Sequence, residues 1–281
     1  MDLTPIERPL RQLRKQLKTV DRNFAPEDVH KLRMRAHRVL AIATIGPEPP
    51  RHLLPSVEAI RKAAGKVRDL DVIRDHALTL AGQSSATSLS RLLRRIGKLR
   101  TRAAARLDKT LHRHGGRLRR DLADYARQLA AAFPSPRATA APAASHRQGM
   151  MKLRRAVAQL RREIAQRPEP GEANLHDLRI RLKRLRVLGR LLPDQDQARF
   201  ASFSTVIAQI GEWHDWRHLA TIAHKMLHTI RHAPLLAQID AAAAPRLARA
   251  IAAARSLRTR PLAASALPGA KIHPRHNHPA A

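Results

Sequence analysis

The sequence contains no cysteine and few aromatic residues, and each shortage excludes a class of function. Without cysteine there is no disulfide, no thiolate nucleophile and no cysteine-ligated zinc site. Aromatic residues make up 2% of the 281-residue chain, which disfavours single-stranded nucleic acid, because its binders stack bases on aromatic rings. No run approaches the ~18 apolar residues of a transmembrane helix, and the N-terminus lacks the apolar segment of a signal peptide. We therefore expect a soluble, cytoplasmic protein.

Acidic residues are also scarce relative to basic ones, and this imbalance indicates a polyanionic partner. Lys and Arg total 54 against 22 Asp and Glu, which gives a formal net charge of +32. Self-repulsion of this size is commonly offset by an anionic partner, whose condensed counterions are released on binding. Nucleic acid, an anionic membrane surface and inorganic polyphosphate all satisfy this requirement.

The apolar residues recur at spacings of three and four along almost every long segment, which is typical of amphipathic helices. We find no strand-like alternation, so the sequence predicts an all-α fold. It predicts a first helical half over residues 3–133, a linker rich in proline and small residues over 134–149, and a second helical half over 150–258. Residues 259–281 have low complexity and are expected to be a disordered tail. Gly115 and Gly116 predict a break between two helices of the first half.

A histidine-led cationic segment occurs twice in the chain. Val29–Arg38 reads Val-His-Lys-Leu-Arg-Met-Arg-Ala-His-Arg, and Leu175–Arg184 reads Leu-His-Asp-Leu-Arg-Ile-Arg-Leu-Lys-Arg, at an offset of 176 − 30 = 146 residues. A second pair of segments, Gly65–Asp69 and Gly211–Asp215, shares this offset (211 − 65 = 146). Because two landmarks keep their order and spacing in both halves, the sequence predicts an internal duplication of one helical unit.

Each histidine-led segment places cations along one stripe of its helix. At ~100° per residue, positions +3, +7, +10 and +14 fall close to the starting histidine. The stripe of the first copy ends at Leu40, and the second copy has the fuller stripe. The stripe residues are His30, Arg33 and His37 in the first copy, and His176, Arg179, Lys183, Arg186 and Arg190 in the second, with Arg38 and Arg184 at the shoulders.

Stacked like charges destabilise an isolated helix, so a stripe without acidic residues indicates a chain of phosphates as counter-charge. Arginines would contact the phosphates bidentately, and histidines near them would be expected to protonate. A solvent-facing cation in an arginine-rich chain is an equally good interpretation of any single arginine. Asp69 and Asp215 are expected to hold a neighbouring arginine or histidine, because a carboxylate facing a polyanion would repel it.

Catalytic patterns are missing from the sequence. There is no phosphate-binding Gly-x-x-x-x-Gly-Lys-Ser/Thr loop and no His-Glu-x-x-His segment. Carboxylates are too sparse for a convincing two-metal site. The sequence therefore predicts no catalytic residue, no metal and no cofactor, and the protein is not expected to be an enzyme.

The duplicated pattern resembles the CHAD family, whose name stands for conserved histidine α-helical domain. The resemblance lies in Val-His-x-Leu-Arg-x-x-x-basic-Arg followed by Gly-x-x-Arg-Asp-x-Asp, here Gly65, Arg68, Asp69 and Asp71, and covers about residues 3–257. It implies two pseudo-symmetric helical bundles with a basic groove or central cavity. It also implies binding of inorganic polyphosphate and association with polyphosphate granules. Many members are fused to a triphosphate-tunnel domain, whose Glu-x-Glu-x-Lys signature is absent here, so the resemblance implies a stand-alone binding module.

The resemblance implies ligand roles only at the positions that match the family pattern. These positions are His30, Arg33, Arg38, His176, Arg179, Lys183, Arg184 and Arg186. His37 and Leu40 depart from the basic residues typical of the family, and His214 stands where the first half has Arg68. His37 and Arg190 are candidates through the helix stripe alone. We therefore expect the second half to hold the anion more tightly.

Three functions remain open at this point. The leading hypothesis is a cytoplasmic, non-enzymatic polyphosphate-binding protein that associates with polyphosphate granules. The second is a sequence-tolerant nucleic-acid binder, which fits the charge but not the scarcity of aromatic residues, so nucleic acid is expected to bind more weakly. The third is an enzyme acting on polyphosphate, which would need carboxylates to hold Mg²⁺.

Overall fold

The computed structural model describes residues 6–21, 23–82, 86–133, 143–192, 200, 202–227 and 232–259. Within these ranges the chain is helical with short connecting turns and contains no strand, which confirms the all-α prediction. The helices are α1 (Arg8–Thr19), α2 (Pro26–Ile42), α3 (Leu53–Leu78), α4 (Ala86–Ala132), α5 (Ala143–Ala165), α6 (Leu175–Gly189), α8 (Ser202–Met226) and α9 (Ala233–Thr259).

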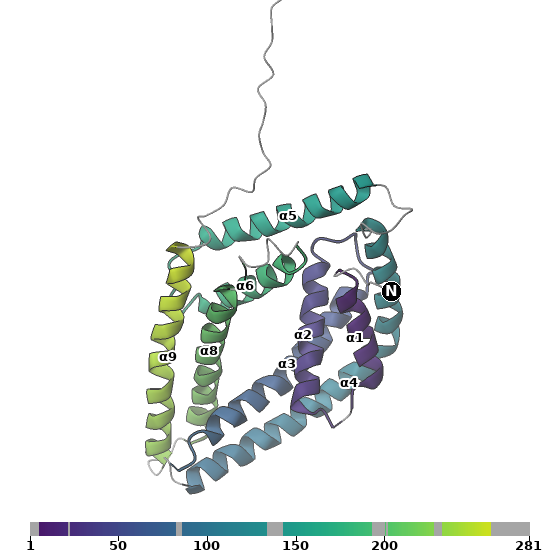
Figure 1. The fold of residues 1–281 in the computed structure, drawn as a ribbon. Coiled ribbons are helices and arrows are strands. Elements are labelled where there is room, and N and C mark those ends of the chain that lie inside the picture. Colours follow the sequence, from purple (N-terminus) through teal and green to yellow (C-terminus); the bar gives the residue numbers. More distant parts are fainter. Residues whose placement is uncertain are drawn as a thin grey trace, which may run out of the picture.

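The helices form two groups that meet mainly through two pairs of helices (Figure 1). In the first group α3 packs along α4 and α2, and α1 packs against α4 and α2. In the second group α8 packs along α9 and α6, and α5 packs against α6. Helix α4 also contacts α5, and the groups meet more extensively where α2 contacts α6 and where α3 contacts α8. These four helices carry the segments that occur twice in the sequence, so the fold brings the two copies together.

Apolar side chains at helical spacing explain why these segments form helices that pack in this way. On α2, Val29, Leu32, Ala36 and Val39 follow one another at three and four residues and are all fully buried. Burial of each larger side chain contributes about 1.5–3 kcal/mol relative to exposure. The buried side chains of both groups form one contiguous core. The cationic stripe of α2 flanks this apolar face, so packing of the core sets the direction in which the stripe points.

Helix α4 differs from the sequence-based expectation. It continues through Gly115 and Gly116, so the predicted helix break is wrong. Leu111 and Leu118, on either side of the glycines, are both buried in the core. Packing of that apolar face offsets the cost of each helical glycine, which is about 1 kcal/mol relative to alanine.

The predicted boundaries of the linker and the tail are partly outside the described residues. Helix α5 begins at Ala143 and therefore extends into the range 134–149 predicted to be a linker, and residues 134–142 are not described. Helix α9 ends at Thr259, and residues 260–281 of the predicted tail are not described either. The division of the chain into two duplicated halves stays a prediction.

Asp71 belongs to the fold rather than to the site. Its side chain is completely buried on α3, where Oδ1 accepts a hydrogen bond from Arg100 Nε of α4 at 2.5 Å. Arg100 Nη2 also donates to the carbonyl of Phe24 at 2.7 Å, in the turn before α2. One arginine thus fixes α4, α3 and the start of α2 relative to one another, and this places the first cationic stripe.

Candidate functional site

The two cationic stripes face each other where α2 meets α6. His30 and His37 on α2 both have their pKa lowered, first by burial and then by cations that include Lys183 on α6. The pKa of Lys183 is lowered to about 7 by burial, by Arg179 and by Arg33 of the opposite stripe. We call this group the central cluster, and it consists of His30, Arg33, His37, Arg179, Lys183 and Arg186. The fold therefore joins two predicted sites into one.

In the first half, Arg33 reaches from α2 to α3. Its Nη1 donates a hydrogen bond to Oδ1 of Asp69 at 2.7 Å, and both side chains are about a quarter exposed, at 27% and 28%. The guanidinium lies over Gly65, where an added Cβ would be 3.6 Å from Arg33 Nε. Asp69 therefore holds an arginine of the stripe, as the sequence predicted.

Arg179 occupies the corresponding place in the second half but is held differently. Its guanidinium lies against Gly211 of α8, where an added Cβ would come within 2.9 Å of Nη2. Nε donates a long hydrogen bond of 3.4 Å to the carbonyl of Ile207. Burial lowers the pKa of Arg179, and Asp215 acts in the opposite direction. Among the residues that the structure describes, Arg179 forms no ion pair, so its charge is available to an anion.

The leading histidine of each segment contacts a different partner in each half. His176 stacks on His214 with ring centroids 4.8 Å apart. The pKa of His176 is lowered by burial and then by His214, whereas that of His30 is lowered by burial and then by Arg68. The exchange of Arg68 for His214 between the halves thus replaces a guanidinium beside the leading histidine with an imidazole ring. The expected protonation of these histidines requires an anion to overcome both effects.

His37 is the most perturbed histidine of the central cluster. Burial, followed by Lys183 and Arg61, lowers its pKa to about 4. Its Nε2 is buried and has no hydrogen-bond partner within the described parts of the chain. The ring is therefore neutral near pH 7 and lies among cations at the junction of α2 and α6.

The remaining predicted site residues divide into two groups. Burial and Arg190 lower the pKa of Arg38, and burial, Arg190 and Arg38 lower that of Arg186. Through Arg186, which belongs to the central cluster, Arg38 and Arg190 extend the cluster with one further cation from each half of the chain. Arg184 is exposed, and at ~100° per residue it points away from the neighbouring Lys183. The structure does not bring Arg184 to the central cluster.

Two residues near the central cluster were not identified from the sequence. Arg61 of α3 forms a bidentate ion pair with Glu58, with two N–O distances of 2.7 Å, and lowers the pKa of His37. His218 of α8 has a pKa lowered by burial, which the carboxylates of Asp69 and Asp215 oppose. Neither residue has a like partner at the 146-residue offset, because those positions are Ile207 (61 + 146) and Val72 (218 − 146). The repeat therefore carried no signal for them.

Two comparisons with known proteins gave a match. The model of the CHAD domain matches residues 5–224, which include every residue of the central cluster. The chain belongs to the CHAD family. The crystal structure of the CHAD domain from the plant Ricinus communis is similar, with a TM-score of 0.64 and 18% identity over 94% of this chain and 92% of that one. At that identity the likeness supports the shared fold alone. The comparison with curated proteins found no match.

In this CHAD protein an aromatic contact braces the two groups of helices beside the site. His76 of α3 stacks on Trp216 of α8 with ring centroids 5.1 Å apart. The guanidinium of Arg246, on α9, lies 4.5 Å from the centre of the Trp216 ring and pairs with Glu212 at 2.7 Å. Because α9 lies beyond the residues that the family model matches, part of this brace comes from outside the matched region.

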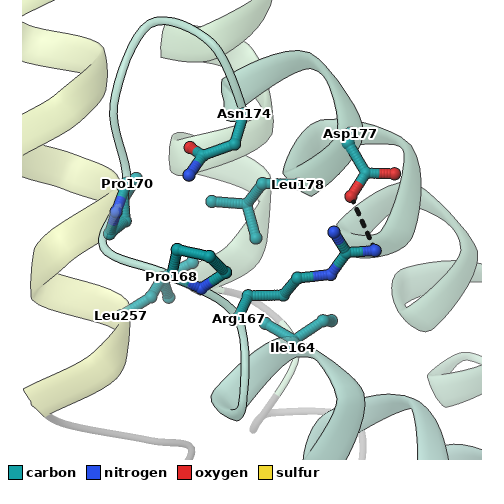
Figure 2. Close-up of a pocket in the computed structure, with 9 residues that line it drawn as sticks. Ile164, Arg167, Pro168, Pro170, Asn174, Asp177, Leu178 and Leu257 are labelled. Atoms are coloured by element: carbon teal, nitrogen blue, oxygen red, sulfur yellow. Dashed lines mark ion pairs between the residues drawn. The ribbon is translucent and has the colours of Figure 1, made fainter.

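A small apolar pocket lies away from the central cluster, between the α5–α6 turn and α9 (Figure 2). Arg167 and Asp177 form an ion pair of 3.1 Å at its edge, as Figure 2 shows. Its apolar lining includes Ile164, Pro168, Pro170, Leu178 and Leu257. None of the predicted site residues lines this pocket.

Two further structural findings concern other classes of function. Across the described ranges, no helix is both long and apolar enough to span a lipid bilayer. In the same part of the chain, no group of three or more histidine, aspartate or glutamate side chains is placed to hold a metal ion.

Proposed function

We propose that this protein binds inorganic polyphosphate at the central cluster and is not an enzyme. Membership of the CHAD family supports the choice of ligand, because this family is associated with polyphosphate binding in general. The observation that carries the proposal is the meeting of two cationic stripes from distant parts of the sequence at one place. A linear chain of phosphates is a counter-ion of suitable chemistry for such a meeting.

The electrostatics of the central cluster support an anionic ligand. Lys183 lies among Arg179 and Arg186 of its own helix and Arg33 of α2, while Asp215 is the carboxylate that opposes them. The lowered pKa of Lys183, about 7, measures how strongly this environment disfavours another positive charge. The negative charge of a phosphate chain would offset the repulsion among these cations. Binding is therefore favoured at the place where the charges of the free protein repel one another.

The location of the aromatic residues supports polyphosphate over single-stranded nucleic acid. All seven Phe, Tyr and Trp residues of the chain are buried, at 6% exposure or less. No such ring is therefore available to stack on a base, which is the usual source of affinity for single strands. Polyphosphate has no bases and requires only cationic contacts.

The carboxylates near the central cluster support binding rather than catalysis. Asp69 is engaged with Arg33, and Asp215 lies 3.6 Å from His214 Nδ1. Phosphoryl transfer usually relies on Mg²⁺ held by carboxylates. Carboxylates that position basic side chains are in a poor arrangement for that role.

A charge-reversal variant tests the proposal. Changing Arg179, Lys183 and Arg186 to Glu is expected to abolish polyphosphate binding in a titration. A matched control changes three exposed cations elsewhere, Lys18, Arg155 and Arg162, to Glu, and is expected to keep most of the affinity. Helical circular dichroism should be the same for both variants. Should the reversed cluster disturb folding, the three Gln substitutions test the same contacts without adding negative charge.

The two outcomes that contradict the proposal are distinct. Unchanged binding by the cluster variant shows that the central cluster is not the binding site. Release of inorganic phosphate from polyphosphate by the purified wild-type protein shows that it is an enzyme. A competition titration at equal phosphate concentration, with duplex DNA against polyphosphate, is expected to show weaker binding of DNA.

The proposed ligand also implies a location in the cell. We propose that the protein is cytoplasmic and associates with polyphosphate granules. A fluorescent fusion of the wild-type chain should concentrate on granules, and the cluster variant should be diffuse. Equal concentration of both fusions on granules contradicts a role for the central cluster in this location.

A further inference from the structure

Helix α4 carries a row of cations that is separate from the central cluster. The row follows three- and four-residue spacing, and every member is exposed. Its members are Arg91, Arg95, Lys98, Arg102, Arg106, Lys109, Arg113, Arg117 and Arg120. At ~100° per residue they fall within an arc of roughly 100°. From Arg91 to Arg120 the helix rises about 43 Å, because each residue adds ~1.5 Å.

The α4 row is not neutralised by neighbouring acids. Between Arg91 and Arg120 the only acidic residue is Asp108, which lies on another side of the helix and contacts His112 at 3.4 Å. Within the described ranges no ion pair involves any member of the row. Like charges at this spacing destabilise a helix by a few tenths of a kcal/mol per pair, so the row destabilises α4 in the absence of a bound anion.

Composition alone does not explain the α4 row. Helix α9 belongs to the same arginine-rich chain, yet half of its described exposed positions are alanines and two of them are arginines. Its exposed alanines include Ala237, Ala241, Ala244, Ala248 and Ala252. An exposed helix face in this protein therefore need not carry arginine.

The position of α4 separates the row from the central cluster. Helix α4 packs against α3 and α1, whereas the central cluster lies on α2 and α6. In Figure 1, α4 runs along the lower and right-hand edges of the molecule. Its buried side chains, such as Leu92, Leu107 and Leu118, turn one face to the core and leave the cationic row on the surface.

We propose that the α4 row is a second binding surface for inorganic polyphosphate, which holds the part of a long chain that extends beyond the central cluster. This inference rests on the proposed function. A long chain would occupy both surfaces of one molecule, whereas a short chain would occupy one at a time. Linking two contacts in this way raises affinity without any new contact, because the second contact becomes intramolecular.

The shape of the α4 row favours polyphosphate over duplex nucleic acid. The row is narrow and follows α4 for about 43 Å of helical rise, along the lower and right-hand edges of the molecule (Figure 1). A flexible, unbranched chain of phosphates can follow it from end to end. A duplex is stiff, and its strands wind around their axis about once in every 34–36 Å, so each strand leaves a narrow row on one face of a helix within one turn. The row also contains no aromatic side chain for stacking on unpaired bases.

Two variants with equal loss of charge test this inference. The row variant changes Arg95, Arg102, Arg106 and Arg113 to Gln, and the scattered control changes Arg14, Lys18, Arg155 and Arg162 to Gln. All eight residues are exposed, and glutamine preserves helix propensity while relieving like-charge repulsion. Binding is measured over a range of salt concentrations with chains of about ten and about one hundred phosphates, which separates one contact from two.

The row variant is expected to bind the long chain at least about tenfold more weakly than the wild type, because it loses linked contacts. The slope of the logarithm of the binding constant against the logarithm of the salt concentration should become shallower by about three. Each of the four lost phosphate contacts removes ~0.7 from this slope for a single-stranded polyanion. The scattered control should retain long-chain affinity within about threefold, because its cations do not form one surface. Both variants should bind the short chain about as the wild type does.

Three results overturn the inference, and they differ in what they leave standing. Equal long-chain affinity in the row variant and the scattered control excludes the α4 row as a binding surface and does not contradict the proposed function. Loss of duplex DNA binding by the row variant, with long-chain polyphosphate unchanged, assigns this surface to nucleic acid. Failure of the wild type to bind either chain length overturns the proposed function together with this inference.

Discussion

The guanidinium of Arg179 lies so close to Gly211 that a Cβ atom at Gly211 would come within 2.9 Å of Nη2. The same relationship is looser in the first half, where a Cβ at Gly65 would be 3.6 Å from Arg33 Nε. The absence of a side chain on one helix thus makes room for an arginine of the opposite helix. In the second half this room is necessary, because 2.9 Å is too short for a real Cβ contact.

Gly211→Ala is expected to weaken polyphosphate binding while leaving stability nearly unchanged. The new methyl group displaces the flexible end of Arg179, and alanine in a helix gains up to about 1 kcal/mol over glycine. Loss of one well-placed charge-assisted contact corresponds to about a tenfold weaker Kd. Gly65→Ala is the matched control and should change the Kd less, because its Cβ fits beside Arg33. Equal effects of the two substitutions in a binding titration would contradict this account.

Lys183 is expected to make polyphosphate binding depend on pH. Its pKa in the free protein is about 7, below the ordinary value of 10.5, because of burial, Arg179 and Arg33. A bound anion raises this pKa, so binding takes up protons above about pH 7, and affinity falls as the pH rises. Calorimetry at pH 8 in two buffers of different ionisation enthalpy measures the uptake. Lys183→Arg keeps the charge without titrating in this range and should remove much of the uptake; no change would exclude Lys183 as its source.

The same residue affects the stability of the free protein in a defined direction. Between about pH 7 and 10.5 the unfolded chain binds more protons at Lys183 than the folded chain. The contribution of Lys183 to the free energy of unfolding therefore rises with pH across this window and is lowest below pH 7. Chemical unfolding of the wild type and Lys183→Arg at pH 6.5 and pH 9 measures the difference. If the free energy of unfolding rises less between pH 6.5 and pH 9 in the wild type than in Lys183→Arg, Lys183 does not have the lowered pKa.

Substitutions of Asp71 and Asp69 are expected to differ in their effect, with a large loss of stability at Asp71 and only a small one at Asp69. Asp71→Ala removes a completely buried partner of Arg100 and should lower the free energy of unfolding by about 3–5 kcal/mol. Asp69→Ala breaks a pair that is about a quarter exposed and should cost only about 1 kcal/mol. It also removes a negative charge beside Arg33, so polyphosphate affinity should be retained or increased. Urea unfolding and a binding titration measure both effects, and loss of binding in Asp69→Ala would show that this carboxylate supports the ligand.

Replacement of the central glycines of α4 is expected to stabilise the protein. Gly115 and Gly116 are helical, and nothing lies within 4 Å of a Cβ added at either position. Gly115→Ala and Gly116→Ala should each raise the free energy of unfolding by up to about 1 kcal/mol. Gly82 is the control, because its φ of +83° favours glycine and alanine there should destabilise by about 1–2 kcal/mol. Destabilisation by alanine at Gly115 would indicate that α4 is broken there.

Short-range patterns in the sequence were sufficient for the fold class, and they singled out the residues that the fold gathers in the central cluster. Apolar residues at three- and four-residue spacing predicted helices, because burial of one face is what stabilises a helix in a folded protein. The repeated segments identified Arg33, Arg179 and Lys183, and the spacing of Asp69 predicted its supporting role. Each of these inferences depends on residues that share one helix or recur at one offset.

Tertiary structure alone decided how these parts combine. Helical periodicity states which side chains share a face of one helix, but it contains no information about which helix lies opposite. The sequence therefore predicted two stripes, and only the contact of α2 with α6 joins them into one central cluster. Tertiary structure also places Arg61 where it lowers the pKa of His37. For the same reason α4 continues through Gly115, since packing of its flanking leucines outweighs a local preference of about 1 kcal/mol.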